Sequence, residues 1–139
     1  MLALEPVIAD RLRLALAPLA ATWQVFGYST DTGQRDTFPL AGVLFADARV
    51  TDSKTGAAEV QPAWRVTLVA RKAQDAAQHI DDAFAAAVAH LHNWSPGAVA
   101  GRRWHPLSLE QVMPPQYPDD GLVGVELTFT THARYDGQV

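Results

Sequence analysis

The pattern of hydrophobic and polar positions is clearest between Trp64 and Trp94, where the period of the pattern changes. Residues 62–71 alternate in polarity, with Val69 as the one exception, and this alternation predicts a strand with one buried face. The apolar side of this strand comprises Trp64, Val66, Leu68 and Ala70, and the polar side Arg65, Thr67 and Arg71.

From Ala73 onward, apolar residues recur every three or four positions, which predicts an amphipathic helix of about five turns. The stripe comprises Ala73, Ala76, Ala77, Ile80, Ala83, Phe84, Ala87, Val88 and Leu91. Ser95, Pro96 and Gly97 are expected to end the helix. Because one of its faces is strongly apolar, we expect this helix to lie on a sheet, with Phe84 meeting Trp64 in the core.

A second helical stripe occupies the N-terminus, where Pro6 suits a first turn. Its apolar positions are Leu4, Ile8, Leu12, Ala15, Leu16 and Leu19, and Glu5, Asp10, Arg13 and Ala17 lie opposite. An export signal is the alternative reading, but Glu5 and Asp10 precede the arginines, so we favour a helix that covers the core. No apolar run is long enough to span a bilayer.

Two further strands are predicted before the central unit. Residues 23–28 form a short strand, and residues 40–51 a longer one. In the longer strand we expect Leu44, Ala46, Ala48 and Val50 on one face, and Val43, Phe45, Asp47 and Arg49 on the other. Residues 29–37 read as an exposed connection, and residues 52–59 as a turn-rich connector, mobile at its tip, that makes a hairpin.

After the central helix, the sequence predicts a flexible link at 97–101 and an extended segment at 102–113, in which Pro106 favours an edge strand. A proline-rich loop at 114–121 precedes the last strand. That strand is expected to direct one set of residues to one side, namely Val123, Val125, Leu127 and Phe129. The other set comprises Glu126, Thr128, Thr130, His132 and Arg134.

Taken together, the elements run α-β-β-β-α-β-β and predict an α+β fold. We expect a mainly antiparallel mixed sheet with two helices packed on one face, formed by residues 1–139 as a single domain. The opposite sheet face is polar and threonine-rich, so it is expected to be hydrated or to meet a partner.

Composition narrows the function classes. Apolar residues make up 48% of the chain and charged residues 19%, which is typical of a globular protein. The formal charge of -4 argues against sequence-independent binding to nucleic acid, which requires a basic surface. The absence of cysteine excludes disulfides and thiolate metal sites.

The ionisable residues give no recognisable catalytic or metal-binding constellation. His79 and His90 would lie about 16 Å apart on one helix, and His90 and His92 point to opposite sides of it. We therefore interpret all five histidines as solvated or held in polar contacts. Adjacent Asp81 and Asp82 diverge on the helix. We expect no catalytic residues, no cofactor and no essential metal, because the spacing does not place three ligands together.

Two short motifs are better explained without a catalytic or nucleic-acid-binding role. Residues 54–56 spell KTG, but the Ser-x-x-Lys partner found in serine β-lactamases is absent, so we expect a turn. Arg102 and Arg103 beside Trp104 and His105 could bind a nucleic acid, but a rim contact to another protein or simple solvation is favoured in an acidic domain.

The order of elements nevertheless resembles a known family. The relevant segments are the N-terminal helix from Pro6, the strand AWRVTLVAR, the helix AQDAAQHIDDAFAAAVAHL, the segment RRWHPLSLEQV and the closing strand GLVGVELTFTTHARY. In pattern and order they resemble the tail terminator, or tail completion, proteins of long-tailed phages and prophages. The likeness covers most of the chain and carries no catalytic motif.

The resemblance implies a non-enzymatic structural protein of the virion tail, assembled in the cytoplasm of the bacterial host. Such subunits form a homo-oligomeric, hexameric ring that caps the head-proximal end of the tail tube, stops its polymerisation and offers a surface to head–tail connector proteins. DNA passes through without specific binding, and no membrane is involved. The alternatives are a small-ligand-binding or enzymatic α+β domain with its pocket between sheet and helices, and another virion ring protein, either a tube or a head–tail joining protein.

Overall fold

The computed structural model describes residues 1–31, 38–54, 56–115 and 121–138. It contains two helices, α1 (Leu4–Leu16) and α2 (Ala76–Leu91). The strands are β1 (Gln24–Gly27), β2 (Leu40–Lys54), β3 (Ala57–Arg71), β4 (Gly97–Val99), β5 (Arg102–Trp104), β6 (Ser108–Met113), β7 (Leu122–Thr130) and β8 (Ala133–Asp136). Parts of the expected connections 29–37 and 114–121 lie outside the described residues.

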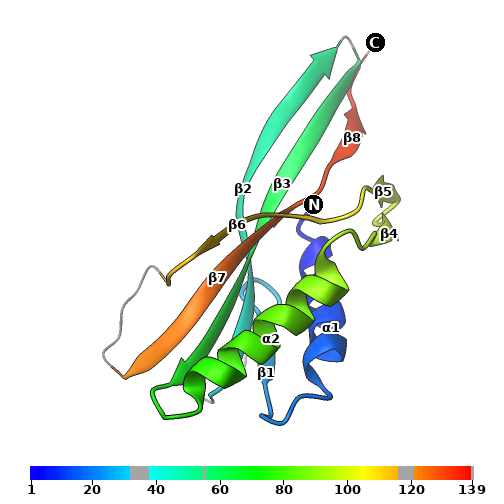
Figure 1. Cartoon of the computed structure of the whole chain (residues 1–139). Helices are drawn as coiled ribbons and strands as arrows, with labels where there is room; N and C mark the ends of the chain where they lie inside the picture. Colours follow the sequence, from blue (N-terminus) through cyan, green and yellow to red (C-terminus); the bar gives the residue numbers. More distant parts are fainter. Residues whose placement is uncertain (32–37, 55, 116–120, 139) are drawn as a thin grey trace.

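The main sheet has the strand order β1-β2-β3-β7-β6, with β8 paired to β3 beyond the end of β7. Strands β1 and β2 are parallel, and the other pairs of the sheet are antiparallel. Both helices pack against the same buried cluster on one side of the sheet (Figure 1). The expected α+β fold, with a mainly antiparallel mixed sheet and two helices on one face, is confirmed.

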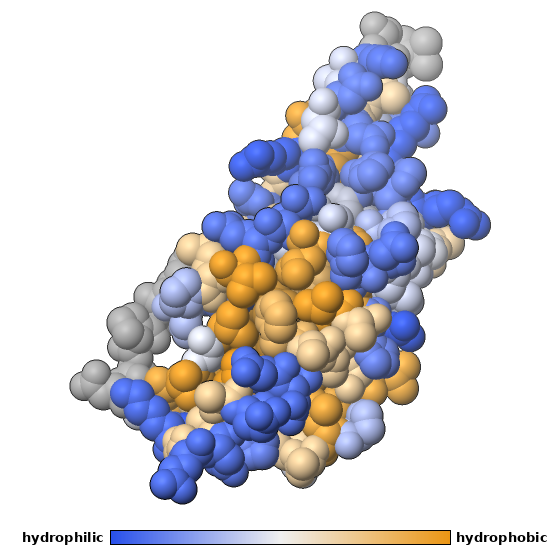
Figure 2. Space-filling model, in the orientation of Figure 1, coloured by the Kyte–Doolittle hydropathy of each residue, from blue (hydrophilic) through white to orange (hydrophobic). Residues whose placement is uncertain are grey.

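A two-stranded projection leaves the body of the molecule (Figure 1). Strands β2 and β3 are each 15 residues long, and their far halves, residues 47–54 and 57–62, extend past the helices, with β8 paired to residues 57–60. We call residues 47–54 and 57–62 the arm. The accessible surface of 7942 Å² exceeds the roughly 7,100 Å² expected for a compact monomer of this mass. Figure 2 shows a largely hydrophilic arm and apolar residues gathered over the body.

The core lies between the helices and the sheet. Trp64, Val66 and Leu68 of β3 are fully buried, as the alternation predicts. The buried residues of α2 are Ala76, Ile80, Ala83, Ala87 and Leu91. The buried face of α2 is therefore narrower than the predicted apolar stripe. Phe84 packs only at the margin of the core, Ala77 is exposed, and Ala73 precedes the helix. The helix also ends before Ser95, at Leu91.

The aromatic partner of Trp64 is a residue of the neighbouring strand. Phe45 lies opposite Trp64 in the β2–β3 register, and their ring centroids are 5.6 Å apart in an edge-to-face arrangement. Such pairs contribute about 0.5–1.5 kcal/mol beyond the area that they bury. Trp64 is therefore held by an aromatic contact within the sheet itself.

Glu5 corrects the expected polarity of the N-terminal helix, because it is completely buried. Its Oε1 accepts hydrogen bonds from the backbone nitrogens of Ser29 and Thr30 at 2.7 and 3.0 Å, and from Thr30 Oγ1 at 3.0 Å. Burial of a carboxylate is tolerated where several donors surround it. Glu5 thus fastens α1 to the turn that follows β1, a role that helical periodicity does not reveal.

Three connections also differ from expectation. The connector 52–59 is mostly strand, because β2 continues to Lys54 and β3 begins at Ala57. The hairpin itself is confirmed, and Gly56 takes the positive φ of 84° that its tight turn requires. The flexible link 97–101 is instead part of the small β4–β5 hairpin. The extended segment 102–113 divides into β5 and the edge strand β6.

A bulge in β2 changes which side chains face outward. The register shifts between Phe45 and Asp47, so that Asp47 pairs with Ala63 of β3. The expected alternation through Ala46 and Ala48 is broken at this point, because a bulge adds one residue to one strand. Asp47 and Arg49 consequently lie on the same sheet face as Leu44 and Arg65, and both line a hollow there.

Candidate functional site

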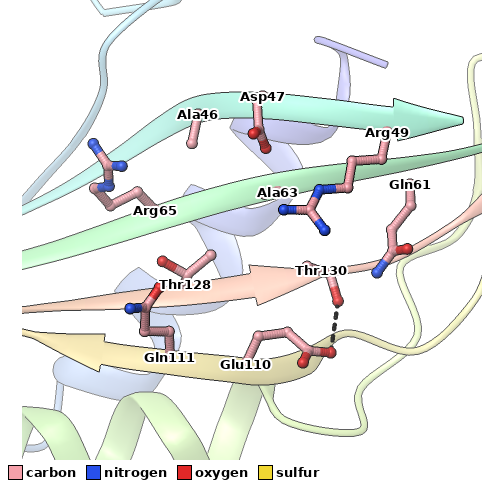
Figure 3. Close-up of a pocket in the computed structure, with 10 residues that line it drawn as sticks. All are labelled: Ala46, Asp47, Arg49, Gln61, Ala63, Arg65, Glu110, Gln111, Thr128 and Thr130. Atoms are coloured by element: carbon pink, nitrogen blue, oxygen red, sulfur yellow. Dashed lines mark hydrogen bonds between the residues drawn. The ribbon is translucent and has the colours of Figure 1, made fainter.

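The face of the sheet opposite the helices carries a polar hollow at the base of the arm (Figure 3). Its volume is about 330 Å³. It is lined by Ala46, Asp47, Arg49, Gln61, Ala63, Arg65, Glu110, Gln111, Thr128 and Thr130. These residues come from β2, β3, β6 and β7, so the polar hollow spans four strands.

Opposite charges are interspersed across the polar hollow. Arg49 and Arg65 lie among Asp47 and Glu110, and Thr130 Oγ1 donates a hydrogen bond of 3.0 Å to Glu110 Oε1. This mixture offers hydrogen-bond donors and acceptors at fixed strand positions, and it does not create an electrostatic potential of a single sign. It is suited to polar contacts with another protein surface.

A second, apolar hollow of about 640 Å³ adjoins the first on the same face. It is lined by Tyr28, Phe38, Leu40, Leu44, Arg65, Thr67, Val69, Lys72, Pro114, Pro115, Leu122, Val123, Gly124 and Glu126. Among the described residues, the helix-free face is therefore polar around the first hollow and largely apolar around the second. Val69, the exception in the alternation of β3, belongs to this apolar half.

Arg65 and Glu126 mark the boundary between the two hollows. Arg65 Nε lies 3.5 Å from Glu126 Oε2, and the Glu126 side chain is only 7% exposed. A buried carboxylate needs such a partner, since an uncompensated charge is costly away from water. The pair holds β3 and β7 together in the middle of the helix-free face.

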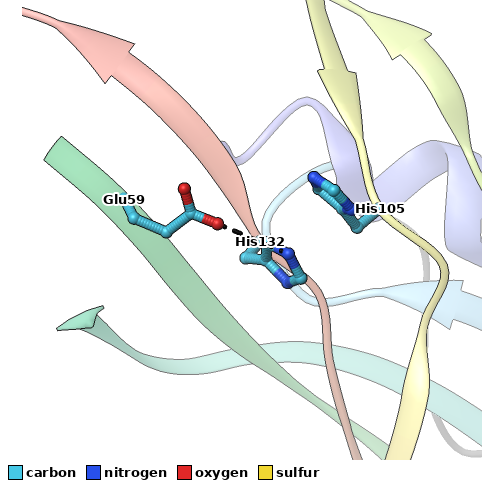
Figure 4. A group of neighbouring side chains, drawn as sticks. All are labelled: Glu59, His105 and His132. Carbon is cyan, nitrogen blue, oxygen red and sulfur yellow. Dashed lines mark ion pairs between the residues drawn. The ribbon is translucent and has the colours of Figure 1, made fainter. Parts of the chain in front are cut away.

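A group of potential metal ligands lies beyond the polar hollow, toward the arm (Figure 4). Glu59 of β3, His132 between β7 and β8, and His105 after β5 bring one ligand atom each to within 4.8 Å of one another. His132 Nε2 is 3.4 Å from Glu59 Oε1, and the two imidazole rings stack with centroids 3.8 Å apart. We call these three residues the histidine cluster.

The histidine cluster corrects the argument that no three ligands come together. Its members are separated by 46 and 27 positions in the sequence, so their spacing gives no local motif. Strand pairing brings them together: Val60 pairs with Ala133, next to Glu59 and His132, and His105 N donates to His132 O at 3.1 Å. The proximity of these three residues could be predicted only if the pairing of β3 with β8 were known.

The other histidines have the polar contacts that the sequence predicts. His79 Nε2 lies 3.0 Å from Asp75 Oδ2, and His90 Nδ1 lies 3.0 Å from the Ala86 carbonyl. His92 Nδ1 accepts a hydrogen bond of 3.0 Å from the backbone nitrogen of Leu109. On α2, the second member of the Asp81–Asp82 pair accepts a 2.8 Å hydrogen bond from Gln78. These groups are dispersed, as expected.

The basic and aromatic segment 102–105 does not form a stacking surface. Trp104 is 2% exposed and belongs to the core, and the Arg102 guanidinium lies over the Tyr135 ring at 3.5 Å from its centroid. Arg102 Nε also donates to the Arg134 carbonyl at 3.0 Å. Of the four residues, Arg103 and His105 are the exposed ones. Segment 102–105 therefore has no exposed Trp104 ring on which a nucleic-acid base could stack.

Two further sequence expectations can be placed. Lys54 and Gly56 of the KTG motif lie at the hairpin tip, with Gly56 in the turn, while Thr55 lies outside the described residues. Within the part of the chain that the structure describes, neither helix has the length and apolarity needed to cross a membrane.

Comparison with known proteins gives one informative result. The chain matches no protein-family model, and none of the curated proteins matches it. Among solved structures, it matches a chain of the "Virion of native gene transfer agent (GTA) particle" with a TM-score of 0.66 and 18% sequence identity. The match covers 95% of each chain. The two chains thus share a fold over nearly their whole lengths.

Proposed function

We propose that the protein is a structural component of a phage-like particle. The observation that carries this proposal is the full-length fold match: 95% of this chain superimposes on 95% of a chain from a gene transfer agent virion. That likeness supports a structural role, with function carried by surfaces.

Within that class, the proposed role is that of a tail terminator. The sequence resembles this family in the order of its helices and strands, and two features of the fold suit a ring subunit. The arm projects beyond the core and can reach a neighbouring subunit, while the helix-free face offers adjoining polar and apolar hollows. One surface reaching a different surface on the next copy makes a head-to-tail interface, which closes into a ring when the rotation permits.

Ring closure gives the proposed function its mechanism. A head-to-tail interface that closes makes a ring of fixed size, hexameric in the family that the sequence resembles, whereas one that did not close would itself polymerise. Bound as the last layer of the tail tube, such a ring stops further addition because its outer face does not bind another tube subunit. Its outer surface then remains available to head–tail connector proteins. The formal charge of -4 suits a lumen through which DNA passes, because an acidic lining does not bind phosphates tightly.

The position of the protein in particles tests this assignment against the other ring components. Purified tails and complete particles would be labelled with a gold-conjugated antibody to the protein and imaged by negative-stain electron microscopy. A tail terminator gives one label at the head-proximal end of each tail. Labels along the tube would indicate a tube protein, and labels on tail-free heads a head–tail joining protein. Absence from both would contradict the structural role.

A further inference from the structure

The histidine cluster carries an inference that is independent of the ring. We propose that Glu59, His105 and His132 bind a divalent transition metal of the zinc class. Two imidazole nitrogens and a carboxylate oxygen form a ligand set that zinc accepts, with the fourth tetrahedral position left for water. The ligand atoms already lie within 4.8 Å of one another (Figure 4).

One of the distances between ligand atoms that a tetrahedral zinc site requires is already present in the structure. Two ligand atoms bound at 2.0–2.1 Å in a tetrahedral zinc site are about 3.3 Å apart. His132 Nε2 and Glu59 Oε1 are 3.4 Å apart. A metal ion could therefore bridge these two side chains almost without changing their separation.

His105 provides the third ligand after a rotation of its ring. The stacked rings are inclined by only 17°, so their nitrogen lone pairs lie in nearly parallel planes, whereas coordination needs them to converge on one point. The His105 side chain is exposed and has room to turn. Rotation gives up the ring stacking and replaces it with a metal–nitrogen bond.

The backbone around the cluster is already fixed, which limits the entropy lost on binding. His105 N donates to His132 O at 3.1 Å, and Thr131 Oγ1 donates to His105 O at 2.5 Å. Glu59 pairs with Arg134 in the β3–β8 ladder. The three ligands therefore stand on segments that are hydrogen-bonded to one another, so that binding requires only side-chain rotations.

The location defines what the metal would do. His105 belongs to the connection between β5 and β6, while Glu59 lies in the arm and His132 at the junction between β7 and β8. A bound ion would tie the arm at Glu59, which pairs with Asp52 in the outer half of the arm, to the segments that carry His105 and His132. The expected consequence is a stiffer arm and a higher melting temperature, since a ligand that binds only the folded state stabilises it.

Titration of untagged, chelator-treated protein tests the proposal. Isothermal calorimetry with zinc chloride is expected to show one saturable site per chain. Cobalt(II) provides an independent readout, because tetrahedral coordination produces visible d–d absorption that zinc should displace. His132→Ala and Glu59→Gln should each weaken zinc binding at least tenfold, and His105→Ala should abolish the tetrahedral cobalt spectrum.

His79→Ala is the matched control, because His79 also lies beside a carboxylate but on α2, with Asp75. It should leave the zinc affinity unchanged. Circular dichroism establishes that each variant is folded, and Glu59→Gln retains nearly the shape of the original side chain. Absence of a one-to-one site in the folded wild-type protein would overturn the proposal. Equal weakening by His79→Ala and His132→Ala would overturn it as well.

Discussion

Arg65 Nε lies 3.5 Å from Glu126 Oε2, and this pair joins neighbouring strands where the two hollows of the helix-free face meet. Arg65→Ala removes the cation beside a carboxylate side chain that is only 7% exposed. We expect the free energy of unfolding to fall by about 1–3 kcal/mol, as for loss of a partner to a largely buried charge. Urea denaturation measures the change.

Arg103→Ala is the control for this prediction, since Arg103 is an exposed arginine of the small β4–β5 hairpin. Its substitution should change the free energy of unfolding by less than about 0.5 kcal/mol. Equal values for the two variants would show that the Arg65–Glu126 pair contributes nothing to stability.

The α2 face gives a second stability prediction, with two substitutions ranked by burial. Leu91 is completely buried, so Leu91→Ala should cost about 2–5 kcal/mol. Phe84 lies at the margin of the core, and Phe84→Ala should cost only about 1–2 kcal/mol, below the 3–5 kcal/mol typical of a fully buried phenylalanine. Chemical denaturation ranks the two. A larger loss of stability for Phe84→Ala than for Leu91→Ala would show that the buried face of α2 is wrongly assigned.

The sequence predicted most of the fold because its strands and helices carry strong periodicities. The last strand illustrates both the success and its limit. Ala63 pairs with Thr130 and Val60 with Ala133, so one register runs through β7 and β8. The ladder is nevertheless interrupted opposite Pro62, which has no N–H to donate. Alternation therefore predicted one strand, but it could not predict the break.

Glu5 provides a third prediction. Glu5→Ala leaves the backbone nitrogens of Ser29 and Thr30 without their carboxylate acceptor, so we expect a loss of about 1–3 kcal/mol in unfolding free energy. Glu5→Gln keeps an amide oxygen that can accept the same hydrogen bonds and should lose less. Thermal denaturation compares the variants. Equal melting temperatures for Glu5→Ala and the wild-type protein would refute this anchoring role.

Features that depend on pairing between distant strands escaped prediction. Residues 47 and 49 reached the polar hollow only because a bulge shifts the phase of β2. The histidine cluster likewise draws on positions 59, 105 and 132, which no local spacing connects. Sequence periodicity gives the faces of individual elements, whereas the candidate sites arise where different elements meet.

The arm supplies a fourth prediction, which concerns assembly. Residues 47–54 are exposed in the isolated subunit, and Lys54 lies next to the turn at Gly56. Limited trypsin digestion should cleave after Lys54 in the free protein and more slowly in the proposed ring, because exposed hairpin tips are favoured sites of proteolysis. Mass spectrometry of the fragments identifies the cut. Equal cleavage rates in the two states would exclude the arm tip from the interface.

The length of tails made without the protein tests the tail terminator assignment most directly. The gene would be inactivated in the genome that carries it, particle production induced and the lysate imaged by electron microscopy, with a plasmid-borne copy of the gene as the control. Our account predicts overlong tubes without heads, and restoration of normal tails by the plasmid. Tails of normal length joined to heads in the inactivated strain would contradict it.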